Sequence, residues 1–183
     1  MDLKGKVVVV TGAGSGIGKE LALQLGQRGV LVAGVDFRAD TLAETARAVI
    51  SAGGTMSEHL VDVSDREQVL ALPETVVARH GAVDAIINNA GIIHAHDTIE
   101  KLLEEQGERV FNINWWGTFY LVKAFLPWLR KQREAYIVNV SSMGGYMPFP
   151  GQVAYGASKA AVKLLTEGLR VELKRDSPIH VAV

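Results

Sequence analysis

The stretch from Val7 to Gly18 reads VVVVTGAGSGIG, and it determines the predicted fold of this chain. Four consecutive valines cannot alternate between a buried and an exposed face, so they predict a strand buried on both faces. Glycines then end the run, and apolar residues at helical spacing follow as far as Gly29. A strand, a glycine-rich turn and a helix N-terminus bring backbone N–H groups and the positive end of a helix dipole together. The stretch therefore predicts a phosphate site.

Two standard phosphate motifs do not fit this loop. The fingerprint G-x-G-x-x-G/A would need a small residue where Ile17 stands, and the G-x-x-x-x-G-K-[ST] loop would need different residues at Ala13 and Glu20. The spacing that fits is T-G-x-x-x-G-x-G, from Thr11 to Gly18. A glycine-rich turn without any ligand is the alternative for the loop alone.

Composition limits the class of protein. A chain of 183 residues with 48% hydrophobic and 21% charged residues suits one globular core. A net charge of -1 gives no basic surface for nucleic acid, and the lack of cysteine excludes disulfides and thiolate metal sites. No apolar run is long enough for a signal peptide or a membrane span, so we expect a cytoplasmic protein. His94 and His96 lack a third ligand nearby, so we expect no metal site and place them at a cleft mouth or in solvent.

Strands and helices alternate along the rest of the chain. We expect further strands at 30–35, 83–87 and 136–140, a third strand that closes with 60–63, and a sixth strand that begins with 179–183. We expect helices at 41–51, 99–131 and 153–174, and another that begins after the capping residue Ser64. This order predicts an α/β, Rossmann-like doubly wound parallel sheet in a single domain over residues 1–183. The sequence ends within the sixth strand.

Asp36 follows the second predicted strand, 18 residues after Gly18. In a βαβ unit a carboxylate here accepts hydrogen bonds from the adenosine ribose hydroxyls. It would repel the 2′-phosphate of NADP, so it favours NAD, although Arg38 could still hold that phosphate. A solvated Asp before a helix is the alternative.

Tyr155 and Lys159 lie four residues apart, so both can point from one helix face into a cleft. Free tyrosine has a pKa of about 10. A cation about 4 Å away at an effective dielectric of about 20 contributes roughly 4 kcal/mol, which lowers that pKa by nearly three units. Tyr155 would then be in range for general acid/base catalysis. A solvent-exposed Tyr/Lys pair is the alternative for this motif alone.

Together, these and further motifs resemble the short-chain dehydrogenase/reductase family over nearly the whole chain. Beyond the glycine loop and Asp36, the resemblance rests on Asp62-Val63, the Asn88-to-Gly91 sequence N-N-A-G, Asn114, Ser142 (13 residues before Tyr155) and the Y-x-x-x-K motif. In Ser15 the chain departs from NADP-preferring relatives, which often place Arg or Lys there. Ser141 is the second choice for the serine, because its spacing is wrong by one.

The resemblance implies hydride transfer between NAD(H) and a carbonyl or secondary alcohol of an apolar substrate. Tyr155 would exchange the proton on the substrate oxygen, and Ser142 would position that oxygen. Lys159 would lower the tyrosine pKa and bind the nicotinamide ribose, and Asn114 would hold a relay water. Asp62 would accept from the adenine amino group, Val63 would line the adenine face, and Asn89 would brace the central strands. The implied cofactor contacts are Gly12, Ser15, Gly16, Ile17, Gly18, Asp36, Phe37, Asp62, Val63, Asn89, Ala90, Gly91, Tyr155 and Lys159.

The resemblance also bears on what surrounds this site. Met143, Tyr146, Met147 and Phe149 suggest an apolar substrate wall, with loop packing as the alternative. The two long helices imply a homodimer or homotetramer. Members of the family continue past the sixth strand into a seventh, so we expect the fold to be C-terminally incomplete. The competing interpretation is a truncated or inactive dinucleotide-binding module with a regulatory or interaction role.

Overall fold

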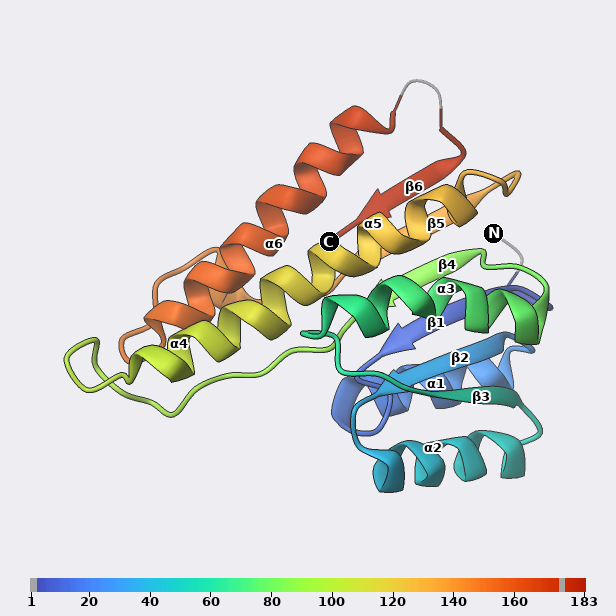
Figure 1. Cartoon of the computed structure of the whole chain (residues 1–183), viewed down its shortest axis with the longest axis horizontal. Helices are drawn as coiled ribbons and strands as arrows, with labels where there is room; N and C mark the ends of the chain where they lie inside the picture. The colour runs from blue at the N-terminus through green and yellow to red at the C-terminus, as the bar shows by residue number, and fades with distance from the viewer. Residues whose placement is uncertain (1–2, 175–176) are drawn as a thin grey trace.

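The protein, described by a computed structural model over residues 3–174 and 177–183, is built around one parallel sheet. Its strand order is β3-β2-β1-β4-β5-β6, and every neighbouring pair is parallel (Figure 1). The predicted doubly wound fold is confirmed. The order reverses beside β1, so a crevice is expected at the carboxyl ends of β1 and β4. The strands are β1 (Val7–Thr11), β2 (Leu31–Asp36), β3 (Thr55–Leu60), β4 (Ala85–Asn88), β5 (Ala135–Asn139) and β6 (Ile179–Ala182).

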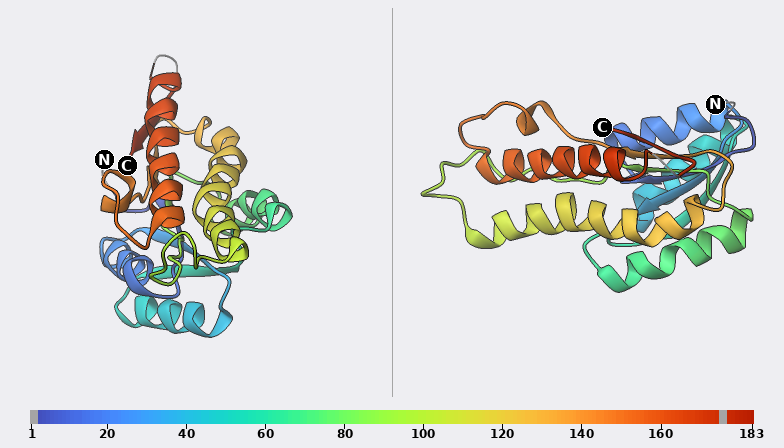
Figure 2. Two further views of the ribbon diagram at one scale, coloured as in Figure 1. Left: turned by 90° about the vertical axis from the view of Figure 1, so that its left-hand side faces the viewer. Right: turned by 90° about the horizontal axis from the view of Figure 1, so that it is seen from above.

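Helices cover both faces of the sheet, and Figure 2 shows α1 on one side with α3 and α5 on the other. Because all five β1 residues are buried, the valine run contributes alternately to two cores. Val8 and Val10 belong to the core beneath α1 and α2, whereas Val7 and Val9 belong to the core beneath α3, α5 and α6. The helices are α1 (Gly16–Gln27), α2 (Ala39–Ser51), α3 (Arg66–His80), α4 (Glu104–Phe111), α5 (Thr118–Leu129) and α6 (Val153–Glu172).

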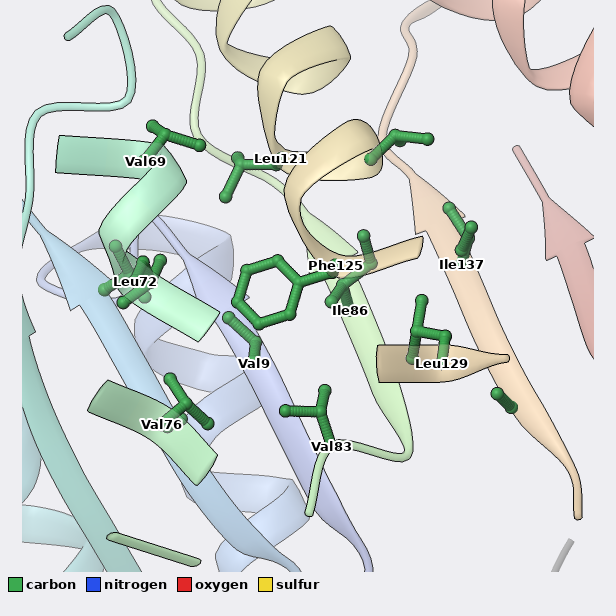
Figure 3. Close-up of a cluster of buried hydrophobic side chains, with 14 of the residues drawn as sticks. Val9, Val69, Leu72, Val76, Val83, Ile86, Leu121, Phe125, Leu129 and Ile137 are labelled. Carbon is green, nitrogen blue, oxygen red and sulfur yellow. The ribbon is translucent and has the colours of Figure 1, made fainter. Parts of the chain in front are cut away.

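The larger core is centred on Phe125 of α5. Figure 3 shows its ring lying between Val9 of β1, Ile86 of β4 and Leu72 of α3, and its side chain is fully buried. Burying a phenylalanine side chain contributes about 1.5–3 kcal/mol to stability. This core fixes α5 across the central strands, and α5 in turn fixes the segment before it, which carries Asn114.

The third strand and the helix after it were predicted incorrectly in detail. β3 ends at Leu60, because its partner β2 ends at Asp36, the residue that pairs with Leu60. Of the residues predicted to close this strand, 60–63, only Leu60 belongs to it, and the other three, Asp62 among them, lie in the following loop. The cap of α3 is Asp65 rather than Ser64: its carboxylate accepts from the N–H groups of Glu67 at 2.9 Å and Gln68 at 3.2 Å.

The predicted helix 99–131 is present as one unbroken helical run from 104 to 129, but it is not α-helical throughout. It consists of α4, a π-helical segment η1 (Asn112–Gly117) and α5, and residues 99–103 precede it. Two contacts accompany the π segment: the Asn114 side chain binds the backbone of Ile92, and Gly117 packs on Val63. A Cβ at Gly117 would stand 3.0 Å from the Val63 carbonyl oxygen, so a larger residue here would have to push Val63 away by a few tenths of an ångström. The other predicted elements are present, with ends that differ by one or two residues.

Candidate active site

A cavity of about 520 Å³ opens at the carboxyl ends of the central strands. Every predicted cofactor residue except Gly18 lines it, and so does Ser142. Asn114 does not line it. The prediction did not include Val61, Ile113 and Val140, which also contribute to the wall, and it ranked Arg38 and Ser141 as secondary candidates.

The glycine loop forms one wall of this cavity. Gly12 and Gly16 have φ values of +68° and +53°, a region that favours glycine. Gly18 lies behind the loop, where a Cβ would overlap the carbonyl oxygen of Gly12. The Ser15 side chain makes no capping hydrogen bond and the first turn of α1 holds no acidic residue. The helix N-terminus therefore presents its N–H groups and positive dipole to an anion, which fits a pyrophosphate.

Asp36 ends β2 at the edge of the cavity and is 7% exposed. Its carboxylate accepts from the backbone N–H of Gly14 at 2.9 Å and from that of Arg38 at 3.0 Å. Each carboxylate oxygen has further lone pairs, so the group can also accept from a ribose. Arg38 lines the same cavity, with its guanidinium 6.0 Å from the centre of the Phe37 ring.

Apolar side chains and Asp62 surround the same end of the cavity. Ile17 and Phe37 are 66% and 61% exposed, large apolar surfaces that a flat ligand would cover. Asp62 Oδ1 accepts from the backbone N–H of Ser64 at 2.9 Å and from its hydroxyl at 2.6 Å. Its Oδ2 remains able to accept from an amino group. Val63 is 7% exposed and lines the wall beside Asp62.

Asn89 joins the two central strands, as predicted. Its side chain donates to the Thr11 carbonyl at 2.9 Å, and its backbone N–H donates to the Thr11 hydroxyl at 3.0 Å. The N–H of Ala90 donates to the same hydroxyl at 3.0 Å. Sequence reasoning gave Thr11 no role of its own. The loop after β4 is thereby fixed against the glycine loop.

Ser142 and Tyr155 lie together at the other end of the cavity. A Cβ placed on Gly144 would stand 3.4 Å from Cε1 of Tyr155 and 3.7 Å from Oγ of Ser142. Ser142 Oγ accepts from the N–H of Gly144 at 3.1 Å, which leaves its hydroxyl hydrogen for a substrate oxygen. Ser141 instead donates its hydroxyl hydrogen to the Lys159 carbonyl at 2.8 Å. This difference favours Ser142 as the residue that contacts substrate.

Lys159 of α6 lines the cavity and is 5% exposed. Its ammonium group donates to the carbonyl oxygen of Val140 at 2.8 Å. Burial lowers the pKa of Lys159 from its ordinary 10.5 to about 8. A lysine with that pKa is still mostly protonated at pH 7, so it can stabilise a nearby negative charge.

Asn114 lies outside the cavity wall, in η1, and is fully buried. Its Oδ1 accepts from the N–H of Ile92 at 2.9 Å, and its Nδ2 donates to Ile92 O at 3.0 Å and to Ser158 Oγ at 2.9 Å. The side chain is thus engaged by the protein itself. Ser158 was not predicted, because no local pattern connects it with a residue 44 positions away.

The histidines near the cleft differ in exposure. His94 is 8% exposed, so it does not face solvent, one of the two places predicted for it; its Nδ1 lies 2.6 Å from the Ala95 carbonyl oxygen. His96 is exposed, as predicted. No group of three or more His, Cys, Asp or Glu among the described residues could hold a metal ion. Within residues 3–174 and 177–183, no helix is long and apolar enough to cross a membrane.

Sequence comparisons identify related oxidoreductases. The short chain dehydrogenase family matches over residues 6–183. SadH of Mycobacterium tuberculosis, described as an oxidoreductase, is 42% identical over 170 residues, which are 93% of this chain and 61% of SadH. The 3-oxoacyl-(acyl-carrier-protein) reductase FabG of Thermotoga maritima is 37% identical over 173 residues, 94% of this chain and 70% of FabG. The chain therefore spans about three fifths of the length of SadH.

Solved structures agree with these relatives. NAD+-bound xylitol dehydrogenase is 33% identical with a TM-score of 0.94, over 100% of this chain and 70% of that one. A short chain dehydrogenase/reductase from Burkholderia phymatum in complex with NAD is 32% identical with a TM-score of 0.94, over 98% of this chain and 64% of that one. Sequence and fold agree along the matched length, and the chain belongs to the short-chain dehydrogenase/reductase family of oxidoreductases.

Proposed function

We propose that this protein transfers a hydride between NAD(H) and the carbonyl or secondary-alcohol carbon of an apolar substrate, with Tyr155 as general acid/base. One observation carries the proposal: Ser142, Tyr155 and Lys159 open into the same cavity as the glycine loop and Asp36. When bound, the nicotinamide supplies or accepts the hydride. The chain's own residues would orient the two reactants and exchange the proton.

Each polar residue at the reacting end has a separate role in this proposal. The Ser142 hydroxyl donates to the substrate oxygen and holds it beside Tyr155. Tyr155 gives that oxygen its proton during reduction and removes it during oxidation. The Lys159 ammonium stabilises negative charge that develops on Tyr155 during the proton transfer and can also donate to the nicotinamide ribose. Asn114 has its side chain engaged by Ile92 and Ser158, and its backbone carbonyl accepts from the Thr118 hydroxyl at 2.8 Å. A relay water would therefore use the second lone pair of that carbonyl.

NAD is the proposed cofactor rather than NADP. The Asp36 carboxylate would repel a 2′-phosphate, whereas it can accept from the two ribose hydroxyls of NAD. Ser15 offers no positive charge beside it. The related xylitol dehydrogenase and the Burkholderia phymatum protein are both described with NAD bound.

Apolar surface beside the reacting end supports an apolar substrate. Met143, Tyr146, Met147 and Phe149 are 45% to 64% exposed, and the last three bound a cavity of about 310 Å³. A substrate that covered this surface would gain about 25 cal/mol per Å² of apolar area removed from water. Secondary alcohols with apolar substituents are therefore the first compounds to test.

Association through η1, α5 and α6 is also part of the proposal. Trp116 is 41% exposed and stacks on Tyr120 with ring centroids 5.6 Å apart. Leu164 and Val171 of α6 are 73% and 76% exposed. These surfaces suit a homodimer or homotetramer, and Leu164→Glu should lower the mass measured by light scattering. An unchanged mass would place the contact elsewhere.

The deciding experiment measures cofactor binding and turnover separately. NADH fluorescence should saturate on titration, and NAD+ should be reduced in the presence of at least one apolar secondary alcohol. Tyr155→Phe should abolish turnover with little change in NADH affinity. Tyr136→Phe is the matched control, since Tyr136 donates to Glu134 at the opposite end of β5. Turnover retained in Tyr155→Phe contradicts the mechanism, and saturable NADH binding without any turnover would indicate a dinucleotide-binding module instead.

A further inference from the structure

Ser158 lies between Tyr155 and Lys159 in α6 and is fully buried. Its hydroxyl makes two hydrogen bonds of opposite sense. Oγ donates to the Tyr155 carbonyl at 2.7 Å and accepts from Nδ2 of Asn114 at 2.9 Å. A single side chain thus links the helix that carries Tyr155 with the π-helical segment that carries Asn114.

The Asn114 amide continues this connection to the loop after β4. Nδ2 uses its other hydrogen for Ile92 O at 3.0 Å, and Oδ1 accepts from Ile92 N at 2.9 Å. Both amide hydrogens of Asn114 are therefore paired inside the protein. Without the Ser158 hydroxyl, one hydrogen would lie buried without an acceptor, a state that proteins avoid by rotating or shifting the group.

The loop held in this way touches the reacting end of the cavity. Gly91, next to Ile92, lines the cavity together with Lys159. A Cβ on Gly91 would stand 3.1 Å from Asn114 Oδ1 and 3.1 Å from Lys159 Nζ. Rotation of the Asn114 amide would consequently disturb the backbone that packs against the Lys159 ammonium.

We propose that Ser158 is a positioning residue for hydride transfer: it fixes the Asn114 amide, which holds the Gly91–Ile92 backbone at its spacing from Lys159. The expected effect of Ser158 on kcat rests on the proposed function. Its effect on the hydrogen bond between Ile92 N–H and Asn114 does not. Ser158 does not line the cavity and so would act through Asn114 rather than on substrate or cofactor.

The same helix supplies a matched control in Thr166. Thr166 is also fully buried, donates to the Val162 carbonyl at 2.7 Å and accepts from Nδ2 of Asn139 at 2.9 Å. It therefore has the same pair of hydrogen bonds as Ser158, but it lies eight residues further along α6 and outside the cavity wall. Ser158→Ala and Thr166→Val each remove one buried hydroxyl.

Two measurements on the full chain test the inference. Amide hydrogen exchange at Ile92, followed by NMR, should be about tenfold faster in Ser158→Ala, because opening of this hydrogen bond becomes easier. In Thr166→Val it should stay as in the wild type. With an active secondary alcohol, kcat should fall about tenfold or more in Ser158→Ala while KM changes little, since the lost interaction acts on the reacting groups.

Two results would contradict a positioning role for Ser158. Unchanged Ile92 exchange in Ser158→Ala overturns the inference, and so does a loss of kcat equal to that of Thr166→Val. If the wild type shows no turnover, the proposed function fails, and Ile92 exchange still shows whether Ser158 holds Asn114. Should Ser158→Ala not fold, Ser158→Cys keeps a weaker acceptor in a chain with no other cysteine. It should give intermediate exchange and kcat, and wild-type values of both would contradict the inference.

Discussion

The ammonium group of Lys159 donates a hydrogen bond to the carbonyl oxygen of Val140 at a distance of 2.8 Å. This contact joins α6 to the end of β5, and the side chain is almost completely removed from water. Burial lowers the lysine pKa to about 8. The charge that the proposed mechanism places beside Tyr155 is thus maintained at a cost in stability, because the folded protein holds the ammonium less favourably than water does.

This cost predicts how stability changes in alkaline solution. Because the pKa of Lys159 is lower in the folded chain than its ordinary 10.5, the unfolded chain binds more protons between about pH 8 and 10.5. The contribution of Lys159 to the free energy of unfolding should therefore rise as the pH increases from 8 to 9.5, by about 1 kcal/mol. Urea unfolding of the wild type and of Lys159→Met at both pH values measures it. If the free energy of unfolding changes equally with pH in the two proteins, Lys159 is not the group responsible.

His59 predicts a second pH effect, in acid. Its Nε2 lies 2.8 Å from Ser57 Oγ, which lies 2.7 Å from Nε2 of His80, and its Nδ1 lies 3.2 Å from Thr75 Oγ1. Burial first, and then the charge of His80, lower the pKa of His59 from 6.5 to about 4. Because the unfolded chain binds more protons in this range, stability is fully present above about pH 6.5 and is lost as the pH falls toward 4.

The corresponding variant is His59→Gln. Its free energy of unfolding should depend less on pH between 6.5 and 4 than that of the wild type, by about 1 kcal/mol after allowance for solvent screening. His96→Gln is the control, because His96 is exposed. If His59→Gln and His96→Gln lose stability in parallel with the wild type, His59 does not cause the acid sensitivity.

Local patterns predicted the parts of this molecule that local physics determines. The four valines from Val7 to Val10 are all buried, because alternate residues pack into the two cores on opposite faces of the sheet. The unbroken valine run predicts this burial from the sequence alone. The cavity likewise gathers residues that follow strands, since the carboxyl ends of parallel strands meet at one edge.

Contacts between distant residues account for what the sequence did not predict. β3 ends at Leu60 because β2 ends at Asp36, and Val61 donates to Asp36 O at 3.0 Å beyond that point. The π segment holds Asn114 against Ile92, 22 residues away, and against Ser158, 44 residues away. Helical periodicity contains no information on such pairs, so it predicted the long helix but not its π segment.

Gly18 and Gly168 both lie in helices, but only at Gly18 does the packing exclude a side chain. At Gly18 a Cβ would overlap the Gly12 carbonyl oxygen, so Gly18→Ala should distort the loop, destabilise the protein by about 1–3 kcal/mol and weaken NADH binding. At Gly168 a Cβ would meet nothing within 4 Å, so Gly168→Ala should stabilise by about 0.5–1 kcal/mol and leave NADH binding unchanged. Thermal unfolding and NADH fluorescence measure both. Equal NADH affinity in the two variants would contradict the phosphate role of the loop.

Asp36 predicts the choice between NADH and NADPH. Its carboxylate holds Gly14 and Arg38 through their N–H groups and would face the ribose of a bound dinucleotide. Asp36→Asn removes the negative charge but keeps one acceptor, so NADPH affinity should rise relative to NADH affinity by about tenfold, with Arg38 then free to bind the 2′-phosphate. Asp40→Asn changes the same charge four residues away in the first turn of α2 and should leave the ratio unaltered. The dissociation constants of both cofactors, measured by fluorescence, give this ratio directly. A wild-type chain that already binds NADPH more tightly would show that Arg38, and not Asp36, governs the site.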